Sequence, residues 1–252
     1  MTASRLSWLV LTVMVTLGTS AALAASERIT LRYYGQAFFL LTTGGGSRIA
    51  LDPFGNIGFP MPTGVTAEAV FITHEHGDHN NAALIGGNPI VFRGLTANPP
   101  GWNPIRERVG DALVYSVPAF HDDQGGTTGR GFNTLLVIEA GGLRLAHLGD
   151  LGQAELTDAQ RRALGRIDVL MIPVGGAPFT IGAVEATRVV EQLQPRVVIP
   201  MHYKTAARPT WPGSDEQPFL AGKPNVQRVG HTVTLTPATL PRERTILVMA
   251  YQ

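Results

Sequence analysis

The stretch FITHEHGDHN, residues 71–80, decides how this sequence is interpreted. It places three of the chain's seven histidines, together with Glu75 and Asp78, within six positions that follow an apolar run. Imidazoles and carboxylates crowded in this way gain little unless a positively charged centre organises them. Gly77 and Asp78 interrupt the β pattern, so a loop presents these side chains. The stretch therefore predicts a metal site just past a β-strand.

Length and composition indicate one globular domain. The chain has 252 residues, of which 44% are hydrophobic, and this is enough for one sizeable α/β domain with its own core. Its 20 basic and 19 acidic residues nearly balance, so no nucleic-acid partner is expected. The absence of cysteine excludes disulfides and thiolate ligands. A metal site must then use His and carboxylate ligands, which suit zinc, manganese or iron.

The first 25 residues have the composition of a secretory signal peptide. A basic residue precedes an apolar run over residues 6–17, and small residues follow, with Ala-Leu-Ala at 22–24. The run is shorter than the ~20 residues that a spanning helix needs, which favours cleavage after residue 24 or 25 over an uncleaved membrane anchor. We therefore expect a periplasmic or secreted protein in which residues 26–252 form one domain without stable membrane insertion.

Short apolar runs rich in β-forming residues recur along the chain and predict strands. They cover residues 29–34, 37–42, 48–52, 69–73, 112–118, 133–140, 143–149, 168–174, 196–200, 232–237 and 245–250. Apolar residues at helical spacing after a threonine predict helices over 157–164 and 180–193, and a third helix is expected near Asn80. Strands interleaved with helices without strict alternation predict an α/β fold with a mixed sheet or two sheets and helices outside.

Four of these strands end next to side chains of the metal-ligand type. His74 and its neighbours follow strand 69–73, and the other three strands are followed by His121, Asp150 and His202. Because α/β folds place their sites at the carboxyl ends of strands, we expect these residues to meet. We infer that His74 and His76 serve one ion while Asp78 and His79 serve its neighbour.

This order of residues resembles the metallo-β-lactamase superfamily of metallohydrolases. Its hallmark is His-x-His-x-Asp-His, followed by a separate His, an Asp after a strand and a last His. The matching residues are His74, His76, Asp78 and His79, then His121 in VPAFHDD, Asp150 in AHLGD and His202 in IPMHY. The stretches YYGQAFFLLTTGGGSRIALDPF (33–54) and HDDQGGTTGRGFNTLLVIEAGGLRLAHLGDLG (121–152) look most like the branch of ascorbate-6-phosphate lactonase-like and uncharacterised metal-dependent hydrolases.

The resemblance implies an αββα sandwich of two mixed β-sheets with outer helices and a dinuclear site at its rim. It implies that His74, His76 and His121 hold the first metal, that Asp78, His79 and His202 hold the second, and that Asp150 bridges them. Two divalent ions are expected, with zinc preferred and manganese or iron as alternatives. The branch commonly has Gly-His-Ser or Gly-His-Ala where this chain has Gly35-Gln36-Ala37. Substrate specificity therefore does not carry over from the branch.

The expected activity is hydrolysis of a small-molecule substrate. Two adjacent divalent ions lower the pKa of a shared water to about 7. We therefore expect an exported metal-dependent hydrolase whose metal-bridged hydroxide cleaves a lactone, ester, amide or phosphodiester bond. The alternatives are an iron-dependent oxidoreductase on the same scaffold and a non-catalytic periplasmic protein that binds a metal or another ligand. The sequence does not define the oligomeric state.

Individual residues near the motif have predicted roles. Asp78 is the expected catalytic residue, which orients the hydroxide and carries a proton. Tyr203 is a candidate oxyanion donor, and Lys204 is a candidate anchor for a substrate anion. An equally good interpretation is that they are an ordinary tyrosine at a strand end and a surface lysine without a role in the reaction. Asp52 is expected to orient a ligand imidazole.

Three further residues are expected to stay out of the chemistry. His147 and His231 are interpreted as structural, and Glu75 should point away from the metals. Pocket walls are expected from 52–64, 94–104 and 207–219, which are rich in Pro, Gly, Phe and Trp.

Overall fold

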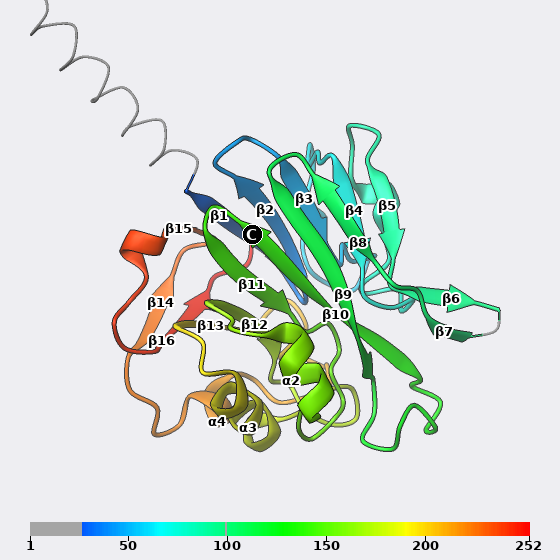
Figure 1. Cartoon of the computed structure of the whole chain (residues 1–252). Coiled ribbons are helices and arrows are strands. Elements are labelled where there is room, and N and C mark those ends of the chain that lie inside the picture. Colours follow the sequence, from blue (N-terminus) through cyan, green and yellow to red (C-terminus); the bar gives the residue numbers. More distant parts are fainter. Residues whose placement is uncertain (1–26, 99) are drawn as a thin grey trace, which may run out of the picture.

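Two β-sheets packed face to face form the body of the protein, and α-helices gather on the outside of one of them (Figure 1). The computed structural model describes residues 27–98 and 100–252. The predicted signal peptide lies outside the described residues. The predicted sandwich of two mixed sheets is confirmed. In the described part of the chain, no helix has the length and apolar character needed to cross a membrane.

The first sheet has six strands in the order β15-β1-β2-β3-β4-β5. Their bounds are β15 Thr232–Leu235, β1 Ile29–Gly35, β2 Phe38–Thr43, β3 Arg48–Leu51, β4 Ala69–Ile72 and β5 Ile90–Arg93. Pairing is antiparallel from β15 to β3 and parallel from β3 to β5. The carboxyl end of β4 lies at the rim of the sandwich, and the motif at 74–79 follows it there.

The second sheet has eight strands in the order β14-β16-β13-β12-β11-β10-β9-β8. Their bounds are β14 Val226–Val229, β16 Thr245–Met249, β13 Val197–Met201, β12 Val169–Pro173, β11 Leu143–His147, β10 Phe132–Ala140, β9 Ala112–Phe120 and β8 Arg106–Val109. Pairing is parallel from β14 to β11 and antiparallel from β11 to β8. A separate hairpin is formed by β6 (Leu95–Ala97) and β7 (Pro100–Trp102).

The helices of the described chain are short. They are α2 (Asp158–Leu164), α3 (Ala183–Leu193), α4 (Gln217–Leu220) and two 3-10 turns, η1 (Ala82–Leu84) and η2 (Pro237–Thr239). Thr157 caps α2, as the sequence predicts, and Gln160 completes a reciprocal cap with it.

Two helix predictions need correction. The helix expected from Thr180 begins at Ala183, where the Glu185 carboxylate accepts from the Gly182 amide at 3.1 Å. The helix expected near Asn80 is only η1, because Asn81 bonds to the carbonyls of Pro53 and Phe54 and so ties this segment to a loop.

Three apolar clusters hold the layers together. The largest lies between the sheets and includes Leu31, Phe39, Phe71, Leu136 and Leu145, all fully buried. A second cluster joins the other face of the eight-stranded sheet to the helices. A third covers the six-stranded sheet through segment 52–67 and η1 instead of an α-helix. Burying one such side chain stabilises the fold by roughly 1.5–3 kcal/mol, so the scaffold does not depend on the polar side chains at its rim.

Candidate metal centre

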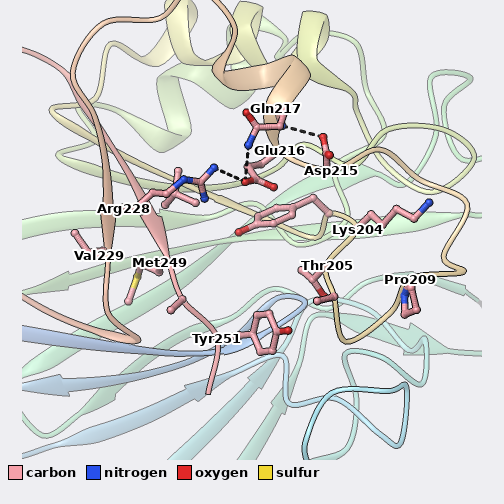
Figure 2. A pocket seen from close by; sticks show the side chains of 14 residues that line it. Lys204, Thr205, Pro209, Asp215, Glu216, Gln217, Arg228, Val229, Met249 and Tyr251 are labelled. Atoms are coloured by element: carbon pink, nitrogen blue, oxygen red, sulfur yellow. Dashed lines mark hydrogen bonds and ion pairs between the residues drawn. The ribbon is translucent and has the colours of Figure 1, made fainter.

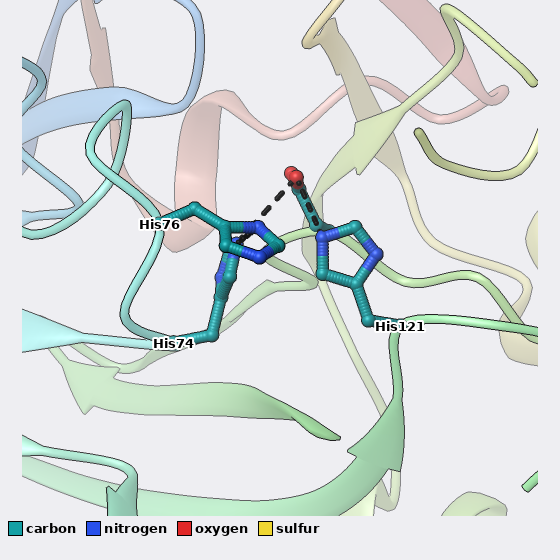
Figure 3. A group of neighbouring side chains, drawn as sticks. His74, His76 and His121 are labelled. Carbon is teal, nitrogen blue, oxygen red and sulfur yellow. Dashed lines mark hydrogen bonds and ion pairs between the residues drawn. The ribbon is translucent and has the colours of Figure 1, made fainter. Parts of the chain in front are cut away.

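The structure brings all seven predicted ligands together at one rim of the sandwich. Their potential ligand atoms form two clusters, in each of which these atoms lie within 4.8 Å of one another. The first cluster contains His74, His76, His121 and Asp150, and Figure 3 shows its three imidazoles around one carboxylate. The second contains Asp78, His79 and His202. The division between the two clusters is the one that the sequence predicts, and it arises because the 74–79 loop faces both.

Asp150 lies between the two clusters and directs one oxygen at each. Its Oδ2 is 3.2 Å from His121 Nε2 and 3.6 Å from His74 Nε2. Its Oδ1 is 3.1 Å from His79 Nε2 and 3.2 Å from His202 Nε2. This is the arrangement that a carboxylate bridging two cations needs.

Glycine at position 149 permits the placement of Asp150. Gly149 has a φ of +51°, and a Cβ there would lie 2.5 Å from Asn133 Oδ1 and 2.7 Å from Thr73 Oγ1. Asn133 also accepts from the Asp150 amide at 3.2 Å and donates to the Leu148 carbonyl at 2.9 Å. Any larger residue at 149 would therefore push β11 away from the loop that follows β4. Glycine at this position allows the backbone to hold the Asp150 carboxylate in place.

The residues present fit a pair of metal ions. Several buried atoms of the clusters have no hydrogen-bond partner, namely the Nε2 atoms of His79, His121 and His202 and Asp150 Oδ1. His79 Nε2 and His202 Nε2 lie 3.1 and 3.2 Å from Asp150 Oδ1, and His121 Nε2 lies 3.2 Å from Asp150 Oδ2, without the geometry of a hydrogen bond. Unpaired buried polar atoms are rare in folded proteins because each costs about 1–3 kcal/mol. Atoms that converge without bonding are satisfied when a cation lies among them.

A buried carboxylate behind the second cluster orients one ligand. Asp52 Oδ2 lies 2.9 Å from His79 Nδ1 and also accepts from the Thr73 hydroxyl at 2.7 Å. Asp52 Oδ1 accepts from the Thr73 amide at 2.8 Å. The bond to Nδ1 requires the proton there, so Nε2 of His79 presents its lone pair to the cluster. The structure thus agrees with the role predicted for Asp52.

Charges within the clusters shift the ionisation of their members. Burial lowers the pKa of His74 well below its usual value, which keeps this imidazole neutral. Burial would also lower the pKa of His79, but Asp150, Asp78 and Asp52 raise it well above that value. Burial would raise the pKa of the Asp150 carboxyl, whereas His202 and His79 hold it well below the ordinary range. The cluster therefore stabilises positive charge among its carboxylates, whether protons or metals supply it.

Gln36, the position that departs from the resembling branch, connects the centre to an arginine. Its side-chain amide donates to Asp78 Oδ2 at 2.6 Å, and its Oε1 accepts from Arg208 at 2.8 Å. Gln36 is 1% exposed and has a φ of +52°. Its backbone carbonyl accepts from the His202 amide at 2.8 Å and from the Tyr33 hydroxyl at 3.0 Å. These bonds fix Gln36 between two ligands and Arg208.

The clusters form the floor of a cavity of about 480 Å³. Its lining residues are Asn56, Ile57, His76, Gly77, Asp78, Arg130, Asp150, Phe179, Arg208 and Trp211. The predicted wall segments 52–64 and 207–219 contribute to it. The third, 94–104, contributes none of the described residues and instead places Trp102 against Phe120 and Phe132. Sequence reasoning missed Arg130 and Phe179, because neither is a residue type that commonly binds a metal.

Tyr203 and Lys204 lie elsewhere. They line a second cavity of about 590 Å³ together with Glu216, Arg228 and Tyr251 (Figure 2). Although both follow His202 directly in the chain, neither lines the cavity above the clusters. Their predicted contact with substrate stays a prediction, and the arginines of the first cavity are better placed for it.

The remaining predictions about single residues agree with the structure. His147 is fully buried, and its Nε2 donates to the Ala37 carbonyl at 2.8 Å while its Nδ1 accepts from the Gly149 amide at 3.2 Å. His231 is exposed. Glu75 points to the surface and pairs with Arg93 at 2.6 Å.

A sandwich of two mixed sheets with His and Asp clusters at its rim is the architecture of the metallo-β-lactamase superfamily. A model of the Beta-lactamase superfamily domain matches residues 30–202, a range that holds all seven ligand residues. The fold also matches a crystal structure from Thermotoga maritima, a proposed Zn-dependent hydrolase of this superfamily. That match has a TM-score of 0.71 and 35% identity and covers 89% of this chain and all of that one.

Curated relatives define the family more closely. A UPF0173 metal-dependent hydrolase of Thermococcus onnurineus is 33% identical over 201 residues, which cover 73% of this chain and 86% of the relative. One of Thermus thermophilus is 33% identical over 194 residues, which cover 70% of this chain and 84% of the relative. The chain belongs to this family of metal-dependent hydrolases.

Proposed function

We propose that the protein is an exported hydrolase with two divalent metal ions, preferably zinc, that cleaves a lactone, ester, amide or phosphodiester bond of a small molecule. The observation that carries this proposal is the convergence of unpaired His and Asp atoms, in two clusters around Asp150, on the floor of an open cavity. A site built only to hold a metal would have no need of such an opening.

His74, His76 and His121 would hold one ion, Asp78, His79 and His202 the other, and Asp150 both. When bound, two such ions supply a water with a pKa near 7 and positive charge opposite a developing oxyanion. The chain's own residues then orient the substrate and handle its proton.

Asp78 is the residue placed to move that proton. Its Oδ2 faces the cluster, 3.5 Å from His202 Nε2 and 3.7 Å from His79 Nε2, and is fixed by Gln36. Its Oδ1 has no hydrogen bond within the described chain, and the residue lines the cavity. Burial would raise the pKa of Asp78, but His79 and His202 hold it well below the usual range, so the group is a carboxylate at neutral pH. We assign two roles to the Oδ1 atom of this carboxylate. It accepts a hydrogen bond from the attacking water and takes a proton from it, and it then passes that proton to the leaving group.

The experiment that tests this function begins with protein purified without chelator, stripped of metal, and reloaded separately with zinc, manganese and iron(II). Each form is assayed on a panel containing a lactone, an aryl ester, an anilide and a bis-aryl phosphodiester. We expect metal-dependent cleavage of at least one class and none in metal-free protein. Equal activity in both forms, or none in any loaded form, would contradict the proposal.

Export is a separate part of the proposal and rests on the leader-like composition of residues 1–25. The full-length gene product expressed in a bacterium should yield a periplasmic protein whose N-terminus begins at residue 25 or 26. Recovery of the intact chain in the cytosol would contradict export and leave the hydrolase proposal standing.

A further inference from the structure

We propose that the substrate carries an anionic group, a carboxylate or a phosphate, that binds to Arg130 and Arg208 beside the metal centre. This inference rests on the proposed hydrolase function of the same site and specifies its substrate class. Arg130 and Arg208, which come from separate loops, thereby have a role in substrate recognition.

Both arginines line the cavity above the clusters, and neither has an acidic partner. The ion pairs of the described residues involve neither guanidinium. Other arginines of the chain commonly do pair, as Arg93 does with Glu75 and Arg228 with Glu216, each at 2.7 Å or less. A half-buried guanidinium without a carboxylate partner is available to a ligand carboxylate or phosphate, which it can bind through two parallel N–H bonds.

An aromatic pair holds the two arginines on the same wall. Phe179 and Trp211 stack with ring centroids 5.1 Å apart. The Arg130 guanidinium lies 4.7 Å from the centroid of Phe179, and that of Arg208 lies 5.5 Å from the centroid of Trp211. Such contacts restrict long flexible side chains before a ligand arrives, which lowers the entropy lost on binding.

Gln36 provides Arg208 with a second anchor. Its Oε1 accepts from one Nη1–H of Arg208 at 2.8 Å and so leaves the other guanidinium N–H groups for a ligand. The same amide group donates to the metal-ligand Asp78. Gln36 therefore links the Arg208 guanidinium directly to a ligand of the second cluster.

The charge of the centre favours the same ligand. Asp78 and Asp150 are the carboxylates within the two clusters that would hold divalent ions, and Asp52 adds a third carboxylate behind His79. Two divalent ions would bring four positive charges against these three carboxylates, and the guanidinium groups of Arg130 and Arg208 add two more. Walls and floor of one sign in a partly enclosed site attract ligands of the opposite sign.

The test measures binding to zinc-loaded protein by calorimetry with three probes of similar shape. Phenylacetate and benzylphosphonate carry an anion, and phenylacetamide is neutral. A hydrogen-bonded charge pair is commonly worth a factor of ten or more in affinity. We therefore expect at least one of the acids to bind the wild type at least tenfold more tightly than the amide, and the acid that does so identifies the group.

The variants are Arg208→Gln and Arg130→Gln, with Arg162→Gln on the exposed face of α2 as the matched control. The preference for the acid should fall at least fivefold in both cavity variants and stay unchanged in the control, at equal zinc content and unfolding temperature. If Arg208→Gln does not fold, Arg130→Gln, on the other loop, decides the question. A preference for the acid that persists in the cavity variants, or that is absent in the wild type, would overturn the proposal.

Binding and cleavage measured on the same zinc-loaded protein distinguish this inference from the proposed function. Arginine-dependent binding of the acids without cleavage of any panel substrate would support the anion site and contradict the hydrolase. Cleavage of neutral esters without any arginine-dependent preference would do the reverse.

Discussion

Replacement of Asp52 by asparagine tests how the second cluster is oriented. The variant keeps the shape of the side chain but replaces one acceptor oxygen with an NH2 group, which can only donate. Asp52 now accepts from the Thr73 amide with Oδ1, and from the Thr73 hydroxyl with Oδ2, which also contacts His79 Nδ1. If the oxygen of the substituted side chain keeps the bond to the Thr73 amide, its NH2 group faces His79 Nδ1.

That contact reverses the tautomer of His79. An NH2 group beside Nδ1 requires Nδ1 to accept, so the proton moves to Nε2 and the lone pair that faces the second cluster is lost. Loss of such an orienting partner commonly costs 10–100-fold in metal affinity, or about 1.4–2.8 kcal/mol. The larger loss should fall on the second ion, because Asp52 contacts His79 directly. It reaches His74 of the first cluster only through the Thr73 hydroxyl, which lies 3.0 Å from His74 Nδ1.

The assay is competition for zinc between the protein and a chromophoric chelator, which resolves two dissociation constants. Glu75→Gln is the matched control, because it makes the same change on an exposed carboxylate of the same loop. We expect one of the two constants to rise 10–100-fold in Asp52→Asn and neither to change in Glu75→Gln. Unchanged constants in Asp52→Asn would refute the tautomer argument.

Three further predictions concern other residues. Fully metallated Asp78→Asn should lose roughly 10²–10⁴-fold in turnover, the usual contribution of a positioned acid or base, and near wild-type turnover would remove its proton-transfer role. His147→Ala should lower the free energy of unfolding by roughly 2–4 kcal/mol and still bind metal, whereas His121→Ala should lose metal and keep its fold. Denaturant titrations and elemental analysis check both variants, and the opposite result would exchange the roles of the two histidines. Burial would raise the pKa of Asp111, but hydrogen bonds from the β2–β3 turn keep it below its usual value. At pH 7 Asp111→Asn should therefore be less stable than the wild type, and the difference in unfolding free energy should shrink as the pH falls through that lowered pKa. A difference that does not depend on pH would contradict this.

The metal centre was predictable from the sequence because its ligands either lie together in one short motif or directly follow a strand. His74, His76, Asp78 and His79 share one short motif, and the other three ligands each come just after a buried apolar strand, which periodicity detects well. The strands of the sandwich interior were predictable for the same reason. β5, β8 and β14 were missed because most of their residues are exposed at sheet edges, where no apolar pattern is required.

The sequence predicted segment 207–219, which contains Arg208, as a wall of the pocket, but it did not predict that Arg130 lies beside it. Arg130 and Arg208 lie 78 positions apart, on loops whose shape depends on turns and on contacts with other segments. Asp122, for example, accepts from the amides of Gln124, Gly126 and Thr128 and so folds the loop that carries Arg130. Only the three-dimensional structure shows that these loops meet.

Residues that are neighbours in the chain can line different cavities. Lys204 follows the ligand His202 by two positions, but the chain turns at His202, which has a φ of +50°. Lys204 therefore reaches the second cavity, and Arg208 occupies the wall above the metals instead.

The number of metal ions bound per chain tests the central claim most directly. Elemental analysis of the wild-type protein, reloaded with zinc and freed of excess metal, should give two ions per chain. The same analysis of His202→Ala should give about one, because that variant removes a ligand of the second cluster alone. Wild-type protein without bound metal, or a single ion whose binding does not depend on either cluster, would contradict the account.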